Sequence, residues 1–114
     1  MNVEDFSNCL NIIDINVIDC GNVTGSIEAL SPCTQLQHIS AFATDMSGDV
    51  KTLFDNMYAA GRISGIFYIN VAFNGKMTFN GTVITPEWIQ SQGGDYVIRA
   101  TFNANGYTVD YPVF

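Results

Sequence analysis

The first residues in this chain that could do chemistry are three aspartates around a glycine. Asp45, Asp49 and Asp55 surround Gly48, and carboxylate oxygens are the ligands that Ca²⁺ prefers in proteins. An EF-hand loop counted from Asp45 would reach Asn56 where a bidentate glutamate is required. We therefore interpret Asp49 as a helix N-cap and predict no metal site.

The other residue types used in catalysis are too few, or wrongly spaced, to predict an active site. His38 is the only histidine, so a Ser-His-Asp triad would need three residues from distant segments to meet. We expect His38 to hydrogen-bond a backbone carbonyl near the start of a strand. The glycines form neither G-x-G-x-x-G nor a P-loop, so no cofactor is predicted. The sequence thus favours a protein that is not an enzyme.

The cysteines also lack the spacing of a functional site. Cys9, Cys20 and Cys33 are odd in number, contain no C-x-x-C pair and lie among aliphatic residues. A zinc site would have only His38 as a fourth ligand. We expect buried free thiols, made in a reducing compartment, and no disulfide framework.

Length and charge exclude several classes of protein. The 114 residues fit a single domain, residues 1–114, and a hydrophobic content of 47% can supply a core. A formal net charge of −7 would repel a phosphate backbone, so no nucleic-acid partner is expected. No basic leader and no long apolar run is visible, so neither export nor a membrane partner is expected.

Residues 47–62 carry the clearest helical pattern. Apolar residues recur with the spacing of one helix face at Val50, Leu53, Phe54, Met57 and Tyr58. The preceding Asp49 can cap the first turn, and the following Gly61 can adopt the left-handed conformation that ends a helix. A helix with one apolar face must pack on a core.

The segment before this helix resembles the helix region itself. Residues 23–27 (Val-Thr-Gly-Ser-Ile) match residues 46–50 (Met-Ser-Gly-Asp-Val), and Leu30 matches Leu53. Short β-type runs at residues 15–18 and 39–42 precede the two segments, so the period is 23 residues, or 24 at the strands. Self-similarity at this period is typical of solenoids.

From residue 65 onwards the pattern is that of antiparallel strands. Asn74-Gly75 is a hairpin dipeptide and predicts pairing of residues 66–73 with residues 76–79. Further turns are expected at residues 80–81 and 105–106, with the second joining the last two strands. The region predicts a β-meander, with a polar connection at residues 87–94.

Residues 23–27 with Leu30, and residues 46–50 with Leu53, resemble the V-S/T-G-D/S-I units of short leucine-rich-repeat proteins of gut bacteria and their tailed phages. The resemblance implies a repeat-plus-cap scaffold used for protein contacts, without catalytic residues. This chain departs from it by having about two repeats, with Ile, Val, Ala and Phe where the family has Leu. A long concave binding surface is therefore not expected.

Strand alternation identifies candidate interface residues. If Ile15 and Ile39 face inward, Ile18 and Phe42 lie on the open sheet face, which suggests contact with another chain or another copy. Alternatively, the N-terminal segment folds over both side chains. Trp88 is the third candidate, either as an interface anchor or as a cover for the end of the sheet.

These observations predict an α+β fold: a small leucine-rich-repeat-like solenoid of about two repeats, with short strands and at least one helix, closed by a C-terminal β-meander. Residues 1–12 would form an N-terminal cap or arm, residues 13–64 the repeats and residues 65–114 a β-rich cap. The final element would close the open end of the solenoid.

The expected function is that of a non-enzymatic structural or protein-interaction module. The resemblance favours an accessory protein of a phage virion, a capsid or tail component made in the bacterial cytoplasm, whose partners are virion proteins or further copies of itself. The alternative is a bacterial leucine-rich-repeat-like module that binds proteins or glycans, in the cytoplasm or at the cell surface within a longer chain. A small hydrolase is a third possibility.

Overall fold

The structure is a computed structural model that describes residues 1–113. Its helical elements are η1 (Val3–Phe6), η2 (Ile27–Leu30), α1 (Val50–Ala59) and α2 (Pro86–Ser91). Its strands are β1 (Asp14–Asn16), β2 (His38–Ser40), β3 (Gly48–Asp49), β4 (Ile66–Asn70), β5 (Met77–Phe79), β6 (Thr82–Val83), β7 (Val97–Asn103) and β8 (Gly106–Asp110). In this part of the chain no helix has the length and apolar character needed to cross a membrane.

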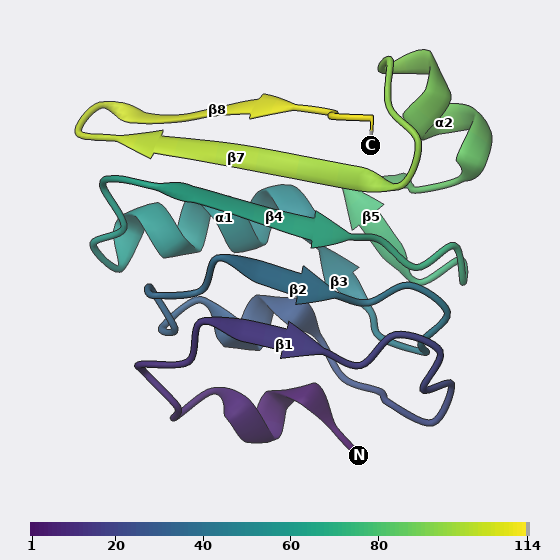
Figure 1. The fold of residues 1–114 in the computed structure, drawn as a ribbon, viewed down its shortest axis with the longest axis horizontal. Helices are drawn as coiled ribbons and strands as arrows, with labels where there is room; N and C mark the ends of the chain where they lie inside the picture. The colour runs from purple at the N-terminus through teal and green to yellow at the C-terminus, as the bar shows by residue number, and fades with distance from the viewer. Residues whose placement is uncertain (114) are drawn as a thin grey trace.

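A five-stranded mixed sheet organises the molecule. Its strand order is β1-β2-β4-β7-β8, with β1, β2 and β4 parallel and the last two strands antiparallel. α1 and η2 lie behind this sheet, whereas no described helix covers its front (Figure 1). One face of the sheet is thus buried and the other is open.

A smaller sheet runs along the far side of the core. β3 pairs with β5 in parallel and β5 with β6 in antiparallel orientation. Isolated parallel bridges, Asn2 to Thr24 and Ser26 to Ser47, continue the same direction towards the N-terminus. β3 leads directly into α1, so the smaller sheet and α1 lie together behind the five-stranded sheet (Figure 1).

α1 confirms the helix predicted from residues 47–62. Val50, Leu53, Phe54 and Met57 are completely buried, because the spacing of these residues places them on the face that meets the sheet. Asp49 caps the helix by accepting a hydrogen bond from the Thr52 amide at 2.9 Å. α1 is therefore the main packing element behind the sheet.

The predicted leucine-rich-repeat-like solenoid with a β-meander cap is wrong. Within residues 1–113 the chain forms an α+β globule with two mixed sheets and only two α-helices. The matched segments do occupy equivalent positions, since Ile15 pairs with Ile39 and both Leu30 and Leu53 are buried. However, η2 is a four-residue 3-10 turn where α1 has ten residues, so the units do not repeat a common structure.

The predicted β-rich cap at residues 65–114 is not a separate layer. β4 lies in the middle of the large sheet, paired with β2 on one side and β7 on the other. Antiparallel strands β7 and β8 then occupy the edge where another parallel unit of a solenoid would be added.

The hairpin predicted at Asn74-Gly75 is also wrong, because β4 and β5 belong to different sheets. The Asn74 side chain instead donates hydrogen bonds to the carbonyls of Thr44 and Met46, at 3.0 and 2.7 Å. These contacts hold the segment between β4 and β5 against the turn that precedes β3. The turn at residues 80–81 joins antiparallel strands as predicted, and the turn predicted at residues 105–106 lies one residue earlier, at 104–105, since Gly106 belongs to β8.

Candidate functional site

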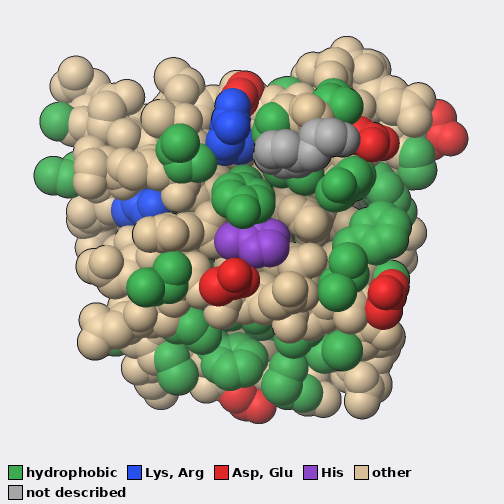
Figure 2. Space-filling view, in the orientation of Figure 1, with side chains coloured by type: hydrophobic (Ala, Val, Ile, Leu, Met, Phe, Trp, Pro, Cys, Tyr) green, Lys and Arg blue, Asp and Glu red, His purple; other side chains and the backbone are tan. Residues whose placement is uncertain are grey.

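A row of polar side chains crosses the open face of the five-stranded sheet. The strand register aligns one residue from each strand: Asp14, His38, Tyr68, Arg99 and Asp110. The His38 Nδ1 lies 3.1 Å from the Asp14 Oδ1, and the imidazole stacks on the Tyr68 ring at 4.5 Å between centroids. Figure 2 shows the histidine near the centre of this face, with acidic and basic side chains on either side.

The far end of the row is held by a bidentate ion pair. Arg99 Nε and Nη2 donate to the two carboxylate oxygens of Asp110 at 2.9 and 2.6 Å, and this pairing raises the pKa of the Arg99 guanidinium. The row therefore satisfies much of its own charge, and it forms a polar boundary across the face.

Beside this boundary lies an apolar hollow of about 270 Å³. Ile18, Phe42, Asn70 and Tyr96 line it, and we call these four residues the apolar hollow. Ile18 is 44% exposed and Phe42 is 37% exposed. The Phe42 ring packs at 6.1 Å from Tyr96 and 6.2 Å from Phe73, so its position is fixed although its outer surface remains open.

Two candidate residues from the sequence, Ile18 and Phe42, thus meet at one site. Each lies two residues after the end of its strand, Ile18 after β1 and Phe42 after β2. The Asp19 amide donates to the Phe42 carbonyl at 3.0 Å, which holds the two segments together. Because side chains alternate between the two faces along β4, Asn70 could also have been predicted to lie on the open face. Tyr96 was missed because it lies just before β7, far from the other three in sequence.

Trp88, the third candidate, lies in a different cluster. Its ring centroid is 5.6 Å from that of Phe79 and 6.0 Å from that of Tyr111. The side chain is half-buried within α2, the helix that replaces the polar connection expected at residues 87–94. Trp88 therefore does not line the apolar hollow.

The N-terminal segment leaves the apolar hollow uncovered. The Val3 amide donates to the Thr24 carbonyl at 2.8 Å, and the Cys33 thiol contacts the Phe6 carbonyl at 3.4 Å. These contacts place η1 against η2, behind the sheet (Figure 1). Residues 3–6 thus cover the end of the buried layer, and Ile18 and Phe42 remain exposed.

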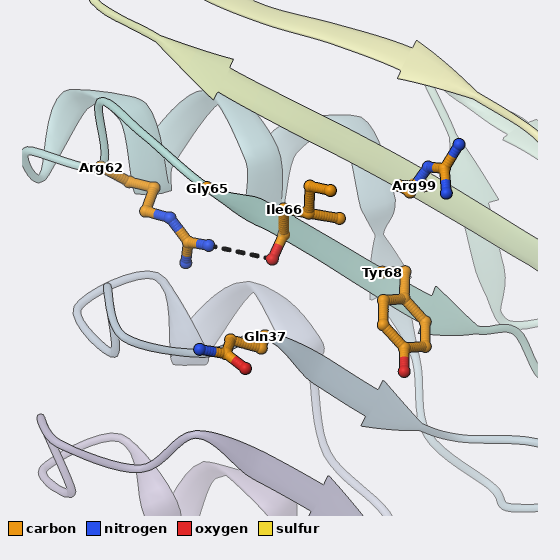
Figure 3. A pocket seen from close by; sticks show the side chains of 6 residues that line it. All are labelled: Gln37, Arg62, Gly65, Ile66, Tyr68 and Arg99. Carbon is orange, nitrogen blue, oxygen red and sulfur yellow. Dashed lines mark hydrogen bonds between the residues drawn. The ribbon is translucent and has the colours of Figure 1, made fainter.

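A larger, open depression of about 500 Å³ lies at the other end of the face, lined by Gln37, Arg62, Gly65, Ile66, Tyr68 and Arg99 (Figure 3). Its most buried cation is already engaged, since Arg62 donates to the carbonyls of Ser64, Thr34, Leu36 and Ile66. Burial lowers the pKa of this guanidinium. The geometry of Arg62 is that of a structural residue that joins loops.

His38 does not make the backbone hydrogen bond that we expected. Both of its ring nitrogens face side chains: Nδ1 faces Asp14, and Nε2 lies 3.4 Å from the Asn70 Oδ1. The expectation failed because the parallel register places polar residues of β1 and β4 on either side of His38. His38 consequently links the polar row to the rim of the apolar hollow.

The three aspartates first considered as metal ligands are held apart. Asp45 forms an ion pair with Lys76 at 2.7 Å, and Asp55 forms one with Lys51 at 2.9 Å. Burial would raise the pKa of Asp49, but hydrogen bonds from Thr78, Gly81 and Thr52 outweigh it and lower the pKa to about 2. Across residues 1–113, no cluster of three His, Cys, Asp or Glu residues is placed to hold a metal ion.

A scan against protein-family models, a search of curated proteins and a search of solved structures found no match to this chain.

Proposed function

We propose that this chain is a non-enzymatic protein-interaction module that binds another protein chain on the open sheet face, at the apolar hollow. The observation that carries the proposal is the position of Ile18 and Phe42, both more than a third exposed on a sheet face that no described helix covers. Exposed apolar groups gathered at one place are typical of interaction sites.

The surroundings of the hollow match the anatomy of a protein interface. The aromatic side chains of Phe42 and Tyr96 both line it, and aromatic residues contribute much of the binding energy in interfaces. Asn70 and His38 supply polar groups at its edge. A partner would thus place an apolar side chain in the hollow and polar groups over the row beside it.

The proposed setting is a tailed-phage particle, in which the chain is an accessory component of the capsid or tail. This part of the proposal is supported by the resemblance of residues 23–30 and 46–53 to units of phage-encoded and bacterial proteins. The partner would then be a protein of the same particle.

The test is titration of the purified chain onto particles assembled without it. We expect saturable binding, weakened at least about tenfold by Phe42→Asp, since loss of a central aromatic contact and burial of a charge both oppose binding. Thr101→Asp is the matched control because Thr101 is exposed on the same face at the opposite end.

Because Phe42 also packs on Phe73 and Tyr96, its replacement can lower stability. Ile18→Asp provides a second variant at a more exposed position. Absence of saturable wild-type binding would contradict the phage setting. Equal binding by the wild type, both hollow variants and the control would contradict the proposed interface.

A further inference from the structure

β8 forms an edge of the five-stranded sheet with no further strand beside it in the described chain. Two backbone bonds establish which of its groups face outward. Phe102 donates to the Gly65 carbonyl and Val71 to the Tyr96 carbonyl, both at 2.9 Å. Even-numbered residues of β7 therefore bond to β4, and odd-numbered ones bond to β8.

The register of the last hairpin carries this alternation into β8. Thr101 pairs with Thr108 and Asn103 with Gly106, so these pairs exchange hydrogen bonds across the hairpin. The intervening residues, Tyr107 and Val109, direct their N–H and C=O groups to the free edge. Four backbone hydrogen-bonding groups are thus aligned along this edge.

The free edge is held in place from within the molecule. The Tyr107 hydroxyl donates to the Asp55 carboxylate on α1, and its ring packs 5.7 Å from the Phe54 ring. Burial and this carboxylate raise the pKa of the Tyr107 hydroxyl above its ordinary value. At the turn, the Tyr58 hydroxyl donates to the Ala104 carbonyl at 2.9 Å. The strand is therefore already ordered for pairing.

We infer that a second copy of this chain adds to the edge, with β8 pairing antiparallel to β8 of the other copy about a two-fold axis at Thr108. Tyr107 of each copy then lies opposite Val109 of the other and exchanges both backbone bonds, which forms four hydrogen bonds in all. The two sheets become one sheet, and the two apolar hollows face the same side.

The side chains of β8 are compatible with this register. Thr108 meets its own counterpart, and Tyr107 meets Val109, and both kinds of cross-strand pair are favourable. Asp110 lies opposite Gly106, so the strand's one carboxylate does not face another. The opposite sheet edge, β1, offers a strand of only three residues that includes Asp14.

Disulfide cross-linking tests this register directly. In a Cys9→Ser, Cys20→Ser background, which removes the two exposed thiols, Thr108→Cys would place two thiols at a non-hydrogen-bonded pair. Such pairs have Cα atoms about 4.5 Å apart, within the range that a disulfide spans. We expect oxidation with a glutathione redox buffer to give a covalent dimer, with a yield that rises with protein concentration.

Thr101→Cys is the matched control because Thr101 is an exposed threonine on the same face, one strand farther from the axis. It should cross-link at least about tenfold more slowly, since its counterpart lies two strand spacings farther away, at about 4.8 Å each. Equal rates at the two positions, or faster cross-linking of Asn16→Cys on β1, would overturn the inference.

Sedimentation velocity of the uncross-linked protein gives an independent readout. We expect a monomer–dimer equilibrium that shifts towards monomer in Thr108→Asp, because two carboxylates would face each other across the axis. Added salt should favour the dimer, since each copy carries a net charge of −7. A wild-type chain that stays monomeric up to millimolar concentration would overturn the inference.

Discussion

At the scale of single residues, Asp49 connects three parts of the fold. Its carboxylate accepts from the Thr52 amide at the start of α1, from the Thr78 hydroxyl at 2.7 Å and from the Gly81 amide at 2.9 Å. A spacing argument identified this residue as a helix cap. The two contacts with the β5–β6 hairpin could not be predicted, because they depend on how distant segments pack.

Asp49→Asn should lower the free energy of unfolding at pH 7 by about 1–2 kcal/mol, because asparagine keeps only one of the two acceptor oxygens that the carboxylate uses. The pKa of Asp49 is lowered in the folded protein, from 3.8 to about 2. Its contribution is therefore fully present above pH 4 and is lost as the pH falls towards 2. Urea unfolding should therefore show a smaller difference in the free energy of unfolding between wild type and variant at pH 2.5 than at pH 7.

The matched control for that series is Asp95→Asn, a change of the same kind at an exposed position. It should leave both unfolding curves close to those of the wild type. A pH-independent difference between Asp49→Asn and the wild type would contradict the assigned role of the carboxylate.

The cysteines differ in exposure, contrary to the expectation that all three are buried. Cys9 and Cys20 are exposed, and Cys33 is buried. Burial, with a smaller effect of nearby Cys9, raises the pKa of the Cys33 thiol. A disulfide reagent such as Ellman's should therefore modify two thiols quickly in the native protein and the third only on unfolding. Rapid modification of all three would contradict the packing of η1 on η2.

At the scale of secondary-structure elements, local signals predicted some elements and misassigned others. The apolar face and cap of α1 are local, so the sequence alone identified this helix. α2 was missed, although Thr85 as N-cap followed by Pro86 is a helix-start signal. The pairing of β4 was wrong because a turn dipeptide reports local chain reversal and does not determine which strand becomes the neighbour.

Arg62 shows how elements are joined by interactions that no sequence pattern reveals. Arg62 is only 8% exposed, and its guanidinium donates to the carbonyls of Thr34, before β2, and Ser64, before β4. Arg62→Ala would remove the donor from these partly buried carbonyls and from the buried carbonyl of Leu36. We expect a loss of about 3 kcal/mol or more in the free energy of unfolding, measured by urea denaturation.

Arg99→Ala serves as the comparison, since Arg99 makes an exposed ion pair on the open face. Its loss in stability should be clearly smaller than that of Arg62→Ala. Equal losses for the two variants would contradict the view that Arg62 is a structural connection between elements.

At the scale of the whole molecule, the internal repeat correctly predicted which residues of the two matched segments lie side by side, but it did not predict the overall architecture. Residues 15–16 and 39–40 pair in register, as the offset of 24 residues requires. Two units cannot bury a solenoid core, which usually needs three or more. The chain instead continues its sheet with antiparallel strands, so the repeat is absorbed into an α+β globule.

The same limit applies to the candidate site. Strand phase could place Ile18 and Phe42 on one face, whereas Tyr96 and the alignment of His38 with Asp14 and Arg99 depend on strand order. Trp88 could not be assigned from sequence, because its neighbours Phe79 and Tyr111 come from separate segments.

The most direct test of the open-face interface is photo-cross-linking from within the apolar hollow. p-Benzoylphenylalanine at position 42 preserves an aromatic side chain, and the same residue at position 101 is the control on the same face. In assembled particles, the account predicts a covalent adduct between position 42 and another particle protein, with little product from position 101. No adduct at position 42, or equal adducts at both positions, would contradict it.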